Sequence, residues 1–172
     1  NIVYGLNRTP LPSGYTGYFA AAVQLKGNET KVYNNVLANN NSTGAFSIGE
    51  FKYYRYENVD YSRNIISNSA SQAIYSQYSN YLFGNSDYNL FYSGTNVYAT
   101  TGEGSKTVPL YTWKKYKSGK FDNHSIIGTS PNFMDEAQDD YRISYKSPAY
   151  GLGFRDIDTE RVGIRNGFKY QT

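Results

Sequence analysis

The chain has 172 residues, of which 17% are aromatic and 18% are charged, and its formal net charge at pH 7 is +3. Disordered chains combine high charge with few aromatic residues, so this composition excludes general disorder and favours a single β-rich domain with a real core. The dispersed Lys and Arg residues argue against nucleic-acid binding, the absence of Cys excludes disulfides and thiolate chemistry, and no apolar run is long enough to span a membrane.

Residues 18–92 hold a repeat, and residues 1–17 before it are expected to form a loop or an incomplete turn. Three segments share one plan, in which an Asn precedes two apolar residues: Asn35-Val36-Leu37, Asn64-Ile65-Ile66 and Asn89-Leu90-Phe91. Their spacings of 29 and 25 residues lie in the range of solenoids and other arrays. A second set of short strands falls in the same phase, at residues 22–25, 45–48 and 73–76. The pattern predicts a coil of parallel strands in which Val36, Ile65 and Leu90 are stacked neighbours.

The three repeated Asn residues stand at the bends of this predicted coil. Asn tolerates the left-handed backbone conformation, and its side-chain amide can bond the backbone of the next turn. We therefore expect Asn35, Asn64 and Asn89 to form a structural ladder rather than to bind a ligand.

Residues 50–60 lengthen the second repeat, and extra length in a coil leaves at a bend, where solenoids often build a binding face. Aromatic rings at such a place can cover the apolar faces of sugars while charged groups bond the hydroxyls. The candidate substrate-binding residues are Tyr53, Tyr54, Arg55 and Tyr56. The alternative is a twisted strand with a polar outer face and cross-strand aromatic pairs.

Residues 93–106 are rich in Thr and Gly and predict a loop, and residues 107–118 predict a short helix. Pro109 suits the first turn of this helix, and apolar residues recur after it at helical spacing. We expect Trp113 to pack on the coil rather than to serve as a sugar platform. Residues 119–172 are then expected to form a terminal turn and a cap.

The last third of the chain carries an ordered set of short motifs, namely His124-Ser125-Ile126, Pro131-Asn132-Phe133, Asp140-Tyr141-Arg142-Ile143 and Ser147-Pro148-Ala149. With the strand at residues 88–92 and the Trp-containing helix before them, these motifs resemble the C-terminal end of right-handed parallel β-helix proteins of the pectate-lyase-like group. The resemblance implies an all-β fold made of the final turns of a right-handed parallel β-helix plus a C-terminal cap with one short α-helix. Many members of that group are secreted carbohydrate-active proteins. The resemblance therefore also implies an extracellular or cell-surface location and a polysaccharide or oligosaccharide as partner.

A glycosidase needs two carboxylates that face each other across the bond it cleaves. Few acidic residues of the coil could be placed in this way, and the catalytic candidates are Glu50, Glu57 and Asp60. In the resembled glycosidases the catalytic acids lie on earlier turns. We therefore expect the main catalytic residues to lie outside this chain.

A polysaccharide lyase instead needs a cation or an Arg to neutralise the uronate and a base to remove the proton α to it. Candidates for these roles are Lys52, Arg55, Arg63 and the Tyr residues, although they form no diagnostic constellation. His124 lies inside the terminal motif, where the resemblance implies a structural position. We expect it to be packed or hydrogen-bonded rather than catalytic.

Four acidic residues offer the oxygen ligands that Ca²⁺ takes, namely Asp135, Glu136, Asp139 and Asp140. They lack the Gly and the terminal bidentate Glu of an EF-hand loop, so we favour a solvated acidic turn. We therefore expect no cofactor, with a Ca²⁺ site as the alternative.

The sequence thus predicts the C-terminal β-helix part of an extracellular bacterial protein that processes polysaccharide, either a glycoside hydrolase or a polysaccharide lyase. The alternatives are a non-catalytic carbohydrate-binding adhesin and a trimeric surface or phage spike. A coil exposes unpaired strand edges at an open end. Because no cap is evident at the start, we expect upstream turns of a parent chain to precede Asn1, or another chain to cover that end.

Overall fold

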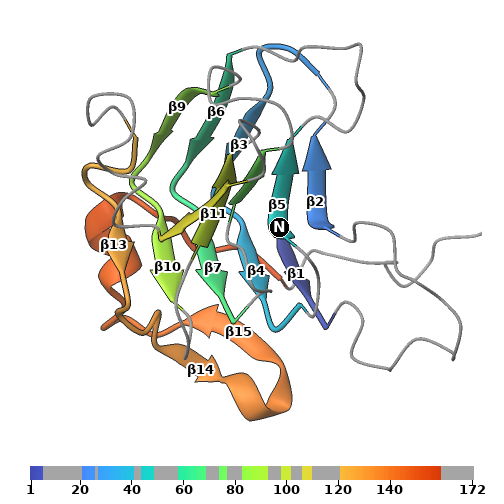
Figure 1. Cartoon of the computed structure of the whole chain (residues 1–172). Helices are drawn as coiled ribbons and strands as arrows, with labels where there is room; N and C mark the ends of the chain where they lie inside the picture. Colours follow the sequence, from blue (N-terminus) through green and yellow to red (C-terminus); the bar gives the residue numbers. More distant parts are fainter. Residues whose placement is uncertain are drawn as a thin grey trace, which may run out of the picture.

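The computed structural model describes residues 1–5, 21–25, 27–40, 44–48, 58–68, 74–76, 83–92, 98–101, 106–109 and 121–159 (Figure 1). These residues form short strands, most of which pair in parallel. Helical structure within the described residues is limited to two short 3₁₀ segments, η2 (Glu136–Gln138) and η3 (Pro148–Leu152). The described part of the chain is therefore mostly β-sheet with parallel strands and almost no helix, which agrees with the expected all-β class.

The first sheet contains five parallel strands, in the spatial order β1 (Ile2–Tyr4), β4 (Val36–Ala38), β7 (Ile65–Ser67), β10 (Leu90–Tyr92) and β13 (Ile126–Ile127). Val36 pairs with Ile65, and Ile65 pairs with Leu90. The predicted stacking of these three residues on adjacent strands is confirmed.

Two further sheets receive the strands between those of the first sheet. The second sheet contains β2 (Ala21–Leu25), β5 (Gly44–Ile48), β8 (Ile74–Ser76), β11 (Tyr98–Thr101) and β12 (Lys106–Pro109). The third sheet contains three parallel strands, β3 (Lys31–Tyr33), β6 (Val59–Ser62) and β9 (Phe83–Asp87). The predicted second set of strands is confirmed by β2, β5 and β8, which pair in parallel.

Two predictions for residues 93–118 are wrong where the structure describes them. β11 occupies part of the expected loop, and β12 lies where the helix was expected to begin. The two strands pair antiparallel, with Thr100 opposite Thr107. β-Branched residues favour strand pairing of this kind, and this preference outweighs the helix-start signal of Pro109. The rest of the expected helix, with Trp113, lies outside the described residues.

A left-handed residue stands at each bend between the third and the first sheet. These residues are Asn34, Arg63 and Tyr88, with φ angles of 57°, 55° and 59°. Each directly precedes one of the repeated Asn residues. The left-handed conformation turns the chain sharply, so that β3, β6 and β9 lead into β4, β7 and β10 at equivalent places (Figure 1).

Both faces of the first sheet are buried. Leu37, Ile66 and Phe91 are at most 3% exposed, and the residues that precede them in the strands, which point to the opposite face, are at most 1% exposed. Parallel strands covered on both faces carry continuous apolar runs, which explains why the Asn residues are followed by two apolar residues.

Residues 133–157, here named the C-terminal segment, cover one face of the first sheet. The segment contains β14 (Phe133–Asp135), η2, β15 (Asp140–Ile143), which pairs antiparallel with β14, and η3. Its residues Tyr141, Ile143 and Phe154 form one apolar cluster with residues of β4, β7 and β10. Residues 119–172 were expected to form a terminal turn and a cap; within this range β13 pairs with β10, and the C-terminal segment lies along the sheet.

Candidate functional site

Most of the predicted site residues lie outside the described residues, namely Glu50, Lys52, Tyr53, Tyr54, Arg55, Tyr56 and Glu57. Asp60 is described and lies on β6, where its half-buried carboxylate accepts a hydrogen bond of 3.1 Å from Nδ2 of Asn85. The structure therefore tests neither the predicted sugar-binding residues nor a pairing of Asp60 with the other two acids. It does bring other candidate residues together.

The repeated Asn side chains form a hydrogen-bonded ladder between the third and the first sheet. Oδ1 of Asn64 accepts bonds from the backbone N and Nδ2 of Asn35, at 3.1 and 2.9 Å. Oδ1 of Asn89 accepts the same two bonds from Asn64, at 2.9 and 3.2 Å. Nδ2 of Asn89 in turn donates to Oδ1 of Asp122 at 3.1 Å. The predicted structural role of these Asn residues is confirmed.

Each repeated Asn is one rung of the ladder, and Ser125, which accepts a bond from the backbone N of Asn89, is the next rung. The ladder also sets the position of the residue that precedes each rung in the chain. These residues form a row along the outside of the bends, which we name the border row: Asn34, Arg63, Tyr88 and His124. Backbone bonds keep the row in register, for example from the N of Asn34 to the O of Arg63 at 3.1 Å. Successive members are therefore about 4.8 Å apart along the sheet. All four side chains are half-buried or exposed.

One end of the border row opens into a cleft of about 670 Å³ between the bends and the C-terminal segment. Its described lining residues are Tyr33, Asn34, Arg63, Gly153, Phe154, Arg155 and Asp156. Asn34 joins the two walls, because its Nδ2 donates to the backbone O of Arg155 at 2.8 Å and its Oδ1 accepts from the backbone N at 2.6 Å. This pair of bonds fixes Arg155 beside the border row.

Gly153 allows the walls of the cleft to approach each other. Its φ is +82°, and a Cβ at this position would lie 3.1 Å from Nε of Arg63. Glycine adopts the left-handed conformation without a steric penalty, and it leaves room for the Arg63 side chain. The close contact places the Arg63 guanidinium group against the C-terminal segment.

The cleft combines two cations with one carboxylate among its described lining residues. Arg63 and Arg155 are exposed, and neither guanidinium group forms an ion pair with another described residue. Asp156 accepts a hydrogen bond of 2.5 Å from the hydroxyl of Tyr150. This bond, together with desolvation and the charge of Asp156, raises the pKa of Tyr150 to about 12. Tyr33, which is 60% exposed, adds an aromatic ring to the cleft.

His124, at the other end of the border row, is hydrogen-bonded as predicted. Its Nδ1 lies 2.7 Å from Oδ2 of Asp87, and its ring stacks on Tyr88 with a centroid distance of 4.7 Å. Partial burial raises the pKa of the Asp87 carboxyl, but the hydrogen bonds from His124 and Tyr88 outweigh this effect and lower the pKa below its ordinary value.

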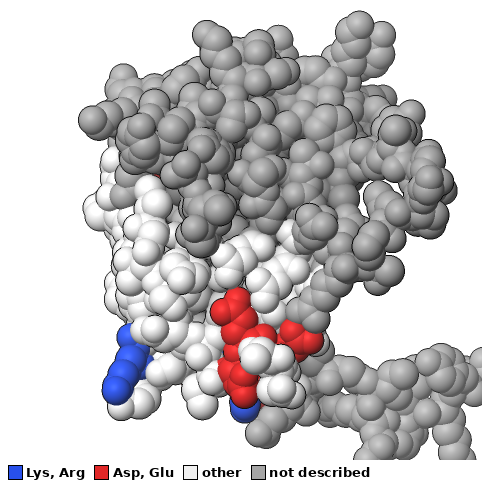
Figure 2. All heavy atoms as spheres, turned by 60° about the horizontal axis from the view of Figure 1, so that its bottom comes forward, with Lys and Arg blue, Asp and Glu red and all other residues white. Residues whose placement is uncertain are grey.

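The four acidic residues considered as Ca²⁺ ligands lie on the C-terminal segment, and Figure 2 shows acidic side chains grouped there. These residues have structural partners of their own, and the contacts of Asp135 and Asp140 are examples. Asp135 accepts a 3.3 Å bond from the backbone N of Gln138, and Asp140 pairs with Arg142 at 2.6 Å. In the part of the chain that the structure describes, no group of three or more His, Cys, Asp or Glu residues could hold a metal ion. These contacts fit a solvated acidic turn.

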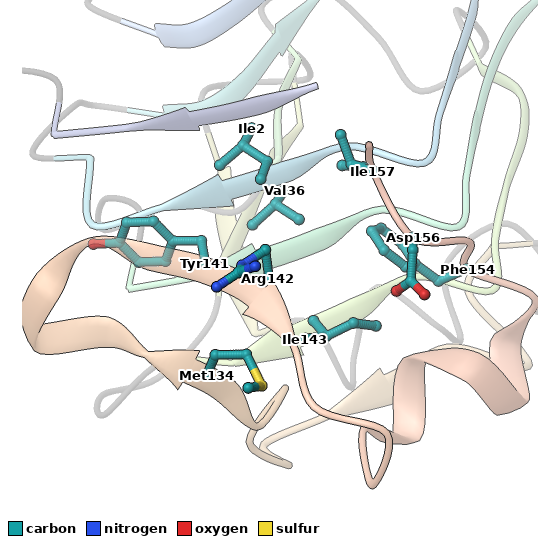
Figure 3. Close-up of a pocket in the computed structure, with 9 residues that line it drawn as sticks. All are labelled: Ile2, Val36, Met134, Tyr141, Arg142, Ile143, Phe154, Asp156 and Ile157. Carbon is teal, nitrogen blue, oxygen red and sulfur yellow. The ribbon is translucent and has the colours of Figure 1, made fainter. Parts of the chain in front are cut away.

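A smaller cavity of about 230 Å³ lies between β1, β4 and the C-terminal segment (Figure 3). Its walls are mainly apolar, with Ile2 and Val36 on one side and Ile143 on the other. Both charged residues in its described lining already have partners, since Arg142 pairs with Asp140 and Asp156 bonds Tyr150. The cleft offers more polar groups to a ligand, so we take the cleft as the candidate site.

Sequence reasoning identified Arg63 as a candidate, did not single out Tyr33 among the Tyr residues, and missed Arg155. Tyr33 directly precedes the first residue of the border row, so the repeat itself contained a signal for its exposed position. No comparable signal existed for Arg155. Its position depends on the return of the C-terminal segment to the bends, which is a long-range feature.

Comparison with known proteins found no match among family models, curated proteins or solved structures. Among the described residues, none belongs to a helix that is long and apolar enough to cross a membrane. The cleft and the border row are therefore the features from which a function can be inferred.

Proposed function

We propose that the chain is the final part of a right-handed parallel β-helix from an extracellular protein that processes polysaccharide. The assignment to a β-helix is supported by three sheets that take their strands in turn from the chain and by an Asn ladder with one rung per repeat. Stacked repeats create an extended surface along their axis, which suits a linear polymer. An extracellular location fits such a ligand.

The ligand that we propose for the cleft is an acidic sugar residue of that polysaccharide. A guanidinium group can bind a carboxylate through two parallel charge-assisted hydrogen bonds. The exposed ring of Tyr33 can cover the apolar face of a sugar. The observation that carries the proposal is one cleft holding Arg63 and Arg155, both without ion-pair partners among the described residues, together with this ring.

The described lining residues favour binding over glycoside hydrolysis. Hydrolysis needs two facing carboxylates, whereas Asp156 is the one carboxylate among those residues and is bonded to Tyr150. A glycoside hydrolase or polysaccharide lyase of this architecture would therefore hold its catalytic groups elsewhere. The alternative, a non-catalytic carbohydrate-binding adhesin, requires no such groups.

Binding of polygalacturonate, before and after chemical reduction of its carboxylates to alcohols, tests the proposal by titration calorimetry. We expect the acidic polymer to bind more tightly than the reduced one. Arg63→Gln and Arg155→Gln should each weaken binding about tenfold, because each removes a charge-assisted hydrogen bond. Arg142→Gln is the matched control and should leave the affinity unchanged, since Arg142 is exposed and lies outside the cleft.

Equal affinity for the acidic and the reduced polymer would overturn the proposal. So would an equal loss of affinity in the Arg142→Gln and Arg63→Gln variants. Urea unfolding of each variant shows whether the protein remains folded under the binding conditions.

A further inference from the structure

The end of the border row beyond the cleft carries a second group of side chains, formed by Asp87, Tyr88 and His124. Tyr88 is 39% exposed, and the side chain of His124 is 61% exposed. Neither residue lines the cleft. Tyr88 and His124 follow Arg63 in the border row. They precede Asn89 and Ser125 in the chain, and these two rungs are joined by a 2.8 Å bond from the backbone N of Asn89 to Oγ of Ser125.

Asp87 holds the imidazole of His124 in one orientation. Its Oδ2 lies 2.7 Å from Nδ1, and its Oδ1 accepts bonds from the backbone N of both Tyr88 and His124, each at 2.8 Å. An ionised carboxylate only accepts hydrogen bonds, so Nδ1 is the protonated nitrogen of the neutral ring. The ring nitrogen that remains for a ligand is Nε2.

Tyr88 restricts the same ring from one side. The two rings are nearly parallel, with an interplanar angle of 6° and a centroid distance of 4.7 Å. Held by Asp87 at its edge and by Tyr88 on one face, the imidazole is pre-organised, which reduces the entropy lost when a ligand binds.

We propose that Tyr88 and His124 form a second binding position for a further acidic sugar of the same polymer, whose carboxylate is held by Nε2–H of the protonated His124. This inference rests on the proposed function of the cleft. Arg63 and His124 are two rungs apart in the border row, which corresponds to about 10 Å. A longer oligosaccharide can therefore reach both positions, whereas a short one occupies the cleft alone.

The charges around His124 determine how its binding responds to pH. Among the described residues, the titratable groups that contact the ring are Asp87 and Tyr88. Asp122, on the same bend, is fully buried and accepts bonds from Ser86 and Ser125. Arg63 lies one rung beyond Tyr88. Gain of a proton by the imidazole therefore adds one positive charge to this part of the border row.

Titration calorimetry with digalacturonate and hexagalacturonate, over a range of pH, tests the inference. Loss of the imidazole proton removes the donor that holds the sugar carboxylate. We therefore expect the affinity for the hexasaccharide to fall about tenfold from acidic to alkaline pH, the usual scale for one charge-assisted hydrogen bond. The affinity for the disaccharide should change much less. His124→Gln should bind the hexasaccharide with the weaker affinity at every pH, and Tyr88→Asn should weaken its binding while keeping the pH dependence.

His124 is the single His of the chain, so its imidazole signals in a proton NMR spectrum are unambiguous and need no variant. Saturating hexasaccharide should move the midpoint of their titration curve to higher pH, and the disaccharide should not. A hexasaccharide that binds but leaves this curve unchanged would overturn the inference while the proposed function stands. Failure of both oligosaccharides and of polygalacturonate to bind would overturn the proposed function and this inference together.

Discussion

Asn64 is 1% exposed and uses both ends of its side-chain amide in the ladder. Its Oδ1 accepts two bonds from Asn35, and its Nδ2 donates to the backbone O of Val32 at 3.0 Å and to Oδ1 of Asn89 at 3.2 Å. An amide can donate and accept at once. The same residue type can therefore repeat at every rung without leaving a buried polar group unpaired.

Replacing Asn64 by Ala should lower the free energy of unfolding by about 3 kcal/mol, because buried polar groups on Asn35, Asn89 and Val32 would lose partners. Urea unfolding followed by circular dichroism measures the change. Asn85→Ala is the control, since Asn85 is exposed and bonds Asp60 on the surface. This variant should lower the free energy of unfolding by less than about 1 kcal/mol. Equal losses in the two variants would contradict a structural ladder.

The left-handed backbone conformations of Arg63 and Tyr88 are relevant to the function of the border row. A left-handed backbone costs roughly 1–2 kcal/mol at a residue with a side chain, and Asn adopts it more readily. Asn34 occupies the equivalent position of the first bend, with nearly the same φ. The presence of an Arg and a Tyr at the other two bends, where Asn would fit better, supports a functional use of their exposed side chains.

At the scale of elements, Tyr141 of β15 is one of the residues that attach the C-terminal segment to the first sheet. Tyr141 is 2% exposed, and its ring lies 4.9 Å from that of Tyr4 and 5.2 Å from that of Phe133. Its hydroxyl accepts a 2.8 Å bond from Nδ2 of Asn39 and donates a 3.1 Å bond to Asp139. The segment thus buries the sheet and also carries one wall of the cleft.

Tyr141→Ala should destabilise the protein by about 3–5 kcal/mol, the cost of removing a buried aromatic side chain. Met134→Ala, in the paired strand β14, removes a side chain that is 58% exposed and should change stability by less than about 0.5 kcal/mol. Thermal unfolding of both variants measures the difference. If Met134→Ala lowered the stability as much as Tyr141→Ala, the segment would be attached to the sheet in another way.

At the scale of the whole molecule, the structure depends on contacts between distant parts of the chain. Successive rungs of the ladder are 29, 25 and 36 residues apart. Strands of three residues are too short to be stable alone. The three sheets and the C-terminal segment therefore stabilise one another, and a local charge change can be measured in the stability of the whole protein.

Acid should destabilise the protein in part through Asp87. Its pKa is lower in the folded protein than in the unfolded chain, so its ionised form adds stability that is complete above the unfolded pKa of about 3.9 and is lost as the pH falls through the lowered folded pKa. Asp87→Asn keeps the oxygen that accepts the two backbone bonds but removes the charge. Urea unfolding should show a stability difference between wild type and variant that is largest near neutral pH and shrinks below about pH 4. A difference that grows in acid would contradict this role of the carboxylate.

The repeat in the sequence was enough to predict the parallel strands, their stacking through Val36, Ile65 and Leu90, and the ladder of Asn residues. These features follow from local rules, because an Asn at a bend followed by two apolar residues can bury both faces of a parallel strand and still satisfy its own amide. Tertiary structure alone decided that β11 and β12 pair where a loop and a helix start were expected. It also decided that Arg155 joins Arg63 and Tyr33 in one cleft. The physical reason is that strand pairing and the docking of the C-terminal segment are long-range contacts, whose free energy outweighs local propensity and leaves no trace in neighbouring residues.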